Sequence, residues 1–203
     1  VSGLVNFREL LRLWKYSKAD GALMGVTIVT VLGLGVEIGI GVGVGASLLL
    51  YLARSSRPHM AVVGRVGESE HFRNVKRHEV QTYPGLLLLR VDENLFFANT
   101  RNIEDRLLKQ VGEQPEIRNI VLIFSAVNYV DASALESLEG LIERLRALGV
   151  TLHLAEVKGP VMDRFDRVGL GEHLEPGQVF LSTHRAVAAL QGETPPSRSA
   201  KAA

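Results

Sequence analysis

The chain has 203 residues, and 23 Lys and Arg against 22 Asp and Glu leave a formal net charge of +1. It has no cysteine, which excludes disulfides, thiolate metal sites and a cysteine nucleophile. The first residue is Val1 rather than Met, so we expect a piece of a longer protein.

The N-terminal segment, residues 1–18, has the pattern of an amphipathic helix. Its apolar face carries Leu4, Phe7, Leu10, Leu11 and Trp14, and its opposite face carries Arg8, Arg12 and Lys15. A basic face and a Trp suit the headgroup level of a membrane. A short helix packed on a soluble neighbour has the same pattern, and both interpretations stay open.

Residues 21–53 are nearly all apolar or Gly, with Glu37 as the one charge. One straight helix of this length would be about 50 Å long, against about 30 Å for a bilayer core. Both flanks are basic, with Lys18 before the run and Arg54 after it, and basic flanks stay cytoplasmic. We therefore predict two short transmembrane helices within residues 19–56. They meet near Glu37 and have about 16 residues each, slightly short of a full crossing.

Glycines recur through this apolar run. Gly35, Gly39 and Gly43 are four residues apart, a spacing that lets helices approach closely in lipid. The G-x-G-x-G at residues 41–45 is no dinucleotide fingerprint, because the third glycine comes one place early and no strand precedes it.

Glu37 is the ionisable group inside the apolar run, and an acid in a membrane segment is a candidate functional residue. The alternative is a place in the outer turn, in water or capping the second helix.

After Pro58 the pattern alternates between strands and helices. The expected strands are residues 61–66, 86–91, 119–124, 150–157 and 179–181, with a short apolar run at 95–98; the expected helices are 100–111, 131–148, 160–168 and 183–190. This alternation predicts an α/β domain over residues 57–190, a mixed β-sheet with flanking helices. Residues 191–203 have no apolar period and are predicted to be a disordered tail.

The loop from Ser125 to Leu135 joins a buried strand to the clearest helix, and it holds the candidate site residues Asn128, Asp131 and Ser133. Asp131 suits a helix N-cap, and Ser133 lies in the first turn, where free N–H groups and the helix dipole favour an anion. Asp and Ser at a helix start are ordinary caps, so capping and a phosphorylation or partner site both remain open.

Enzymatic interpretations find little support. The histidines show no metal-ligand spacing on one helix face, and no G-x-S-x-G elbow exists; the six are His59, His71, His78, His153, His173 and His184. We predict no catalytic residue, no metal and no cofactor. The basic run from Arg73 to His78 lacks clustered aromatics, so it indicates a solvated strand or a membrane-facing patch rather than a nucleic-acid site.

The chain resembles the C-terminal end of a SulP (sulfate permease) family anion transporter followed by its STAS domain. The matching segments cover about residues 10–190 in order, and they are LWKYSKADG, VEIGIGVGVGASLLLYLARSSRP, LLLLRVDENLFFANT, VLIFSAVNYVDASALESLEGL and VKGPVMDRF.

The resemblance implies a multi-pass protein of the plasma or inner membrane, with a membrane domain of two inverted seven-helix repeats. Residues 21–53 would be its last two helices, on the gate or scaffold side. The family's anion site lies upstream, so no substrate-binding residue is expected in this chain. Sulfate, bicarbonate and dicarboxylates are all substrates within the family.

The resemblance also implies a cytoplasmic STAS domain that regulates transport and binds partners. Related anti-sigma-factor antagonists carry a phosphorylated Ser in a D-S-[ST]-G loop, with which Ser133 aligns, whereas Ala132 and Ala134 depart from it. The implied partners are the rest of the membrane domain, the bilayer, a second copy, and a regulatory protein or kinase. The alternative is a membrane-tethered STAS switch or scaffold without transport.

Overall fold

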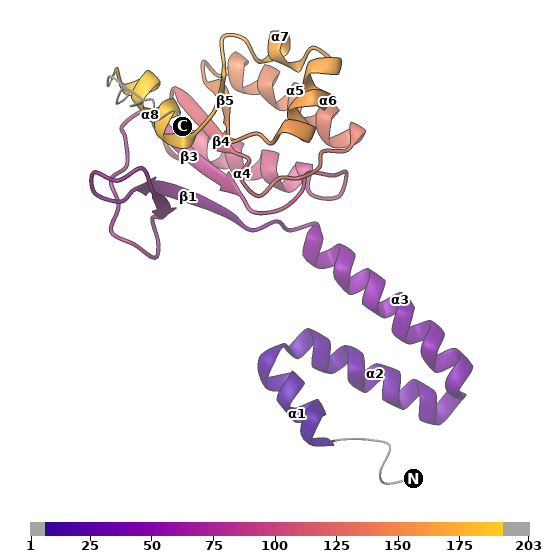
Figure 1. The fold of residues 1–203 in the computed structure, drawn as a ribbon. Coiled ribbons are helices and arrows are strands. Elements are labelled where there is room, and N and C mark those ends of the chain that lie inside the picture. Colours follow the sequence, from indigo (N-terminus) through magenta and orange to yellow (C-terminus); the bar gives the residue numbers. More distant parts are fainter. Residues whose placement is uncertain (1–6, 193–203) are drawn as a thin grey trace, which may run out of the picture. The chain divides into compact units, whose positions relative to one another are not determined.

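The structure is a computed structural model that describes residues 7–192. The chain divides into two compact units, with the boundary between Ser56 and Arg57 (Figure 1). Residues 1–6 of the predicted amphipathic segment and residues 193–203 of the predicted tail lie outside the described residues.

The first unit contains three helices: α1 (Phe7–Tyr16), α2 (Lys18–Leu34) and α3 (Val36–Ser55). The apolar run therefore folds as two helices, as predicted, but they meet at Gly35, whose φ of 95° ends α2. The length predicted for α2 agrees with the structure, whereas α3 is longer than the predicted 16 or so residues. The helices have 17 and 20 residues, or about 26 and 30 Å, because the break precedes Glu37 and α3 continues to Ser55.

By length and composition, Val36–Ser55 is the one helix within residues 7–192 that could cross a membrane. Small residues let α2 and α3 pack closely. A Cβ on Gly39 would overlap the side chain of Val31, and one on Gly43 would lie 3.1 Å from Thr27 Oγ1. The predicted role of the glycine spacing is therefore confirmed at two positions. A Cβ on Gly41, in contrast, would have no neighbouring atom within 4 Å.

Hydrogen bonds from Arg54, which we call the Arg54 clasp, connect the end of α3 to the start of α2. Arg54 at the end of α3 donates to Asp20 Oδ2 at 3.0 Å and to Ser17 Oγ at 3.2 Å. Ser17 is also the N-cap of α2, since its hydroxyl accepts the N–H of Asp20. The start of α2 and the end of α3 are thus joined side by side.

The second unit is built on a six-stranded sheet in the order β2-β1-β3-β4-β5-β6. Its strands are β1 (Met60–Arg65), β2 (Phe72–Asn74), β3 (Leu86–Val91), β4 (Asn119–Ile123), β5 (Thr151–Ala155) and β6 (Val179–Phe180). β1 runs antiparallel to β2 and β3, whereas β3 to β6 are parallel. The predicted mixed sheet is confirmed.

Helices cover both faces of the sheet, and alternate strand residues feed two cores. Leu87 and Leu89 of β3 join the core beneath four helices, which are α4 (Thr100–Glu113), α5 (Ala132–Ala147), α6 (Gly159–Arg167) and α7 (Leu170–Leu174). Leu86 and Leu88 join the core beneath α8 (Thr183–Gln191). Parallel strands buried on both faces explain the continuous apolar runs in the sequence.

Three short elements differ from expectation. Residues 95–98 form no strand but a loop with a single bridge, from Leu95 to Val130. β2 and α7 have three and five residues, too few to show a period in the sequence. Gly192, with a φ of 72°, ends α8, which runs to Gln191, the first residue of the expected tail.

Candidate functional site

The candidate loop lies at the carboxyl end of β4 and leads into α5. Asp131 is the N-cap of α5, since its Oδ1 accepts the N–H of Ala134 at 2.7 Å. Its Oδ2 accepts the N–H of Phe97, in the loop after β3, at 3.0 Å. The capping prediction is confirmed, and Asp131 also ties two loops together.

Asn94, in the loop after β3, also connects this loop to the loop after β4. Its Oδ1 accepts the N–H groups of Asn128 at 2.8 Å and Tyr129 at 3.2 Å. Leu95 adds two backbone bonds, from its N–H to the carbonyl of Tyr129 and from its carbonyl to the N–H of Asp131. The sequence did not single out Asn94, because its role depends on β3 lying next to β4.

Ser133 is exposed at the second residue of α5. Its carbonyl accepts the hydroxyl of Ser137 at 2.8 Å. Within residues 7–192 its own hydroxyl makes no hydrogen bond, so it is open to solvent beside the helix N-terminus.

Asn128 is exposed, but its side chain is used inside the loop. Its Nδ2 donates to the carbonyl of Ala126 at 3.1 Å, and its Oδ1 accepts from Lys158 Nζ at 2.5 Å. Asn128 therefore connects the loop after β4 to the start of α6.

A groove of about 270 Å³ runs beside the loop and is lined by Tyr129, Val130, Asp131, Leu135, Arg164 and Val168, among others. The guanidinium of Arg164 lies 4.4 Å from the ring centroid of Tyr129 and donates to the carbonyl of Val130 at 3.3 Å. The groove thus combines apolar walls, an aromatic ring and a cation next to the start of α5.

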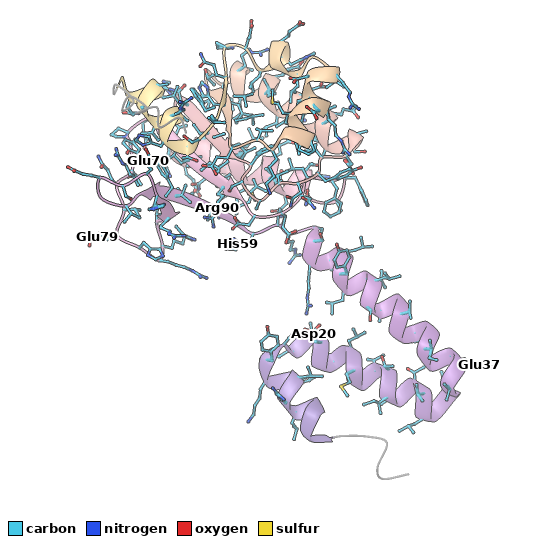
Figure 2. The ribbon with its side chains drawn as sticks, in the orientation of Figure 1. Asp20, Glu37, His59, Glu70, Glu79 and Arg90 are labelled. Carbon is cyan, nitrogen blue, oxygen red and sulfur yellow. The ribbon has the colours of Figure 1, made fainter. Side chains whose placement is uncertain are left out.

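A second charged cluster lies at the end of β3, at Asp92. Arg90 Nε donates to Asp92 Oδ1 at 2.6 Å, and His59 Nδ1 lies 2.6 Å from Asp92 Oδ2; Figure 2 labels His59 and Arg90. Burial of Asp92 acts to raise the pKa of its carboxyl. The hydrogen bonds and the charges of Arg90 and His59 together outweigh burial and hold this pKa below its ordinary value.

Glu37 belongs to the other unit and lies, exposed, in the first turn of α3 (Figure 2). Glu37 and the loop residues therefore belong to different units. No cluster of His, Cys, Asp or Glu that could hold a metal occurs in the described part of the chain.

The mixed sheet, the helices on both faces and a capped loop entering α5 define the class of fold. A family model described as "STAS domain" matches residues 77–186, more than half of the chain. The chain belongs to the STAS domain family.

Similar proteins extend the match into the helical unit. "Probable sulfate transporter 4.2" of Arabidopsis thaliana is 35% identical over 198 residues, covering 92% of this chain and 29% of the relative. "High affinity sulfate transporter 2" of Stylosanthes hamata is 29% identical over 203 residues, covering 93% and 30%. The expected resemblance to sulfate transporters is confirmed, and the chain spans less than a third of these relatives.

The fold has a counterpart among solved structures. The murine Slc26a9 anion transporter in the inward-facing state superposes with a TM-score of 0.79 over 90% of this chain and 30% of that chain. The sequence identity is 23%, so this likeness supports the fold.

Proposed function

We propose that the chain is the C-terminal part of a secondary active inorganic-anion transporter of the sulfate and bicarbonate type. In this proposal α2 and α3 are the last two helices of a multi-pass membrane domain. The STAS domain is its cytoplasmic regulatory and interaction module, and the anion site lies outside this chain.

One observation carries the proposal. The match to a named sulfate transporter runs over 92% of this chain, so it covers the helix pair as well as the STAS domain. A STAS domain alone would support a switch protein equally well. The apolar 20-residue α3 directly before the domain favours a membrane protein.

The regulatory role is proposed for the loop of Asp131 and Ser133. Ser133 offers an exposed hydroxyl at a helix N-terminus, where a phosphate would add about −1.5 to −2 charges in a favourable field. The groove with Arg164 offers a neighbouring contact for a regulatory protein or kinase. The alternative is a membrane-tethered STAS switch without transport, favoured by the same exposed hydroxyl.

The test is anion uptake by the longer protein that carries this chain. Cells lacking their own sulfate uptake should accumulate labelled sulfate, bicarbonate or a dicarboxylate when they express it. Ser133→Asp should change the uptake rate at equal protein in the membrane, because it places a negative charge at the proposed phosphorylation position. Ser133→Ala serves as the uncharged control.

Two outcomes would count against the proposal. Protein present in the membrane without uptake of any of these anions would favour the tethered switch. Uptake that is identical in wild type, Ser133→Asp and Ser133→Ala would leave transport intact and remove the regulatory role of Ser133.

A further inference from the structure

A cluster of cations lies on β2 and the turn that follows it. Arg73, Lys76, Arg77 and His78 are all exposed, and we call residues 73–78 the basic turn. Within residues 7–192 none of its Lys or Arg side chains forms an ion pair. Glu79, labelled in Figure 2, is the one acidic residue next to it. The positive charge of the turn is therefore not neutralised internally.

The basic turn is held in shape by Asn74. Asn74 Oδ1 accepts the N–H of Lys76 at 2.8 Å, and its carbonyl accepts the N–H groups of Arg77 at 3.0 Å and His78 at 3.1 Å. The turn is also fixed to the sheet, since Val75 donates to the carbonyl of Val62 at 3.1 Å. An ordered turn presents its cations at a low cost in conformational entropy.

The short connection between α3 and β1 indicates which surface the basic turn lies near. α3 ends at Ser55 and β1 begins at Met60, so these two residues can be at most about 18 Å apart. Val62, to which the turn is bonded, is only two residues into β1. The turn therefore lies near the part of the domain that is tethered to α3.

A nucleic acid fits the basic turn less well than a lipid surface. Proteins that bind single-stranded nucleic acid add aromatic rings for base stacking, and the segment from Arg73 to Gln81 contains none. Anionic lipid headgroups attract Lys and Arg that lie near the membrane surface, and the basic turn carries three such cations, beginning at Arg73, 18 residues after Ser55 ends α3. Both the charge and the tether favour a lipid surface.

We propose that the basic turn binds the anionic phospholipid headgroups of the membrane that α3 crosses. This inference rests on the membrane insertion of α3 in the proposed function. Each Lys or Arg near such a surface is worth about a fivefold change in the ratio of docked to undocked domain. Docking would limit the motion of the STAS domain relative to the bilayer.

The test uses the whole 203-residue chain in lipid nanodiscs. Because the chain has no cysteine, Gln81→Cys gives a unique site for a spin label beside the turn, without changing the charge. The readout is the ratio of the immobilised to the mobile spectral component. Nanodiscs of phosphatidylcholine alone are compared with nanodiscs that also contain phosphatidylglycerol.

We expect the ratio to rise in the anionic nanodiscs and to fall again with added salt, because salt screens exposed charges. Lys76→Gln should lower the ratio about fivefold, and Lys76→Gln with Arg77→Gln about 25-fold. The matched control, Arg101→Gln with Arg185→Gln, removes two exposed cations from α4 and α8 and should leave the ratio unchanged.

The possible failures can be told apart. A chain that enters both kinds of nanodisc with the same spectrum overturns the lipid contact and leaves the proposed function standing. A folded chain that stays out of nanodiscs overturns both. A spectrum that responds to a short RNA oligonucleotide in neutral nanodiscs, and not to anionic lipid, assigns the turn to nucleic acid and contradicts the inference.

Discussion

At the scale of single residues, Asp131 and Ser133 have opposite surroundings although they are two residues apart. Asp131 uses both carboxylate oxygens on backbone N–H groups, whereas the hydroxyl of Ser133 is exposed. One residue therefore holds the loop in place, and the other is available for modification.

Substitution by alanine should separate these roles. Asp131→Ala removes an N-cap and the contact to Phe97, and it should lower the free energy of unfolding by about 1–2 kcal/mol. Ser133→Ala should change it by no more than about 0.5 kcal/mol. Urea unfolding of the STAS domain within the detergent-solubilised chain measures both. An equal loss for the two variants would contradict the assignment of roles.

The cap at Asp131 could be predicted from the sequence because capping is local, reaching three residues to Ala134. The contacts of Asn94 and Arg164 could not. Each joins residues 34 positions apart, through the side-by-side arrangement of loops that follow different strands. Their partners become visible only when the order of the strands is known.

At the scale of elements, His153 links three neighbouring strands. Its Nδ1 accepts the N–H of Gln178, next to β6, at 3.1 Å, so its proton lies on Nε2, which donates to Asn119 of β4 at 3.2 Å. Burial lowers the pKa of His153, since the charged ring would be poorly solvated there.

This environment predicts a loss of stability in mild acid. The unfolded chain takes up a proton at His153 as the pH falls through about 6.5, whereas the folded chain takes it up only at a lower pH. The stability that neutral His153 contributes to the fold is therefore complete above about pH 6.5. It is lost as the pH falls towards the pKa of His153 in the folded chain. Urea unfolding between neutral pH and mild acid measures this slope.

His153→Gln should flatten the slope, while His173→Gln, at an exposed histidine, should leave it as in wild type. A slope that persists in His153→Gln would show that other groups cause it.

Long helices and strands were predicted from the sequence more accurately than short ones. The predicted strand 86–91 agrees with β3, and the helix predicted over 131–148 agrees with α5 within one residue at each end. The turn between α2 and α3 lies near Glu37, as predicted, but Gly35 rather than the charge of Glu37 breaks the helix. A positive φ is easy for glycine, and the charged residue is accommodated in the following helical turn.

At the scale of the whole molecule, the proposed membrane topology requires the α2–α3 pair to turn back on itself. The Arg54 clasp joins the start of α2 to the end of α3, and glycine contacts pack the two helices together. In the proposed membrane arrangement α2, although at about 26 Å it is shorter than the bilayer core, crosses together with α3. Both ends of the pair then lie on one side and Glu37 on the other. The basic flanks favour the cytoplasmic side for these ends in the proposed topology.

Thiol labelling in cells tests this topology most directly, since each introduced cysteine is unique in the chain. Intact cells that express the protein are treated with a membrane-impermeant maleimide. We predict that Glu37→Cys is labelled in intact cells, and that Lys18→Cys and Arg57→Cys are labelled only after permeabilisation. Labelling of Lys18→Cys from outside, with Arg57→Cys protected, would show a single crossing and contradict the account.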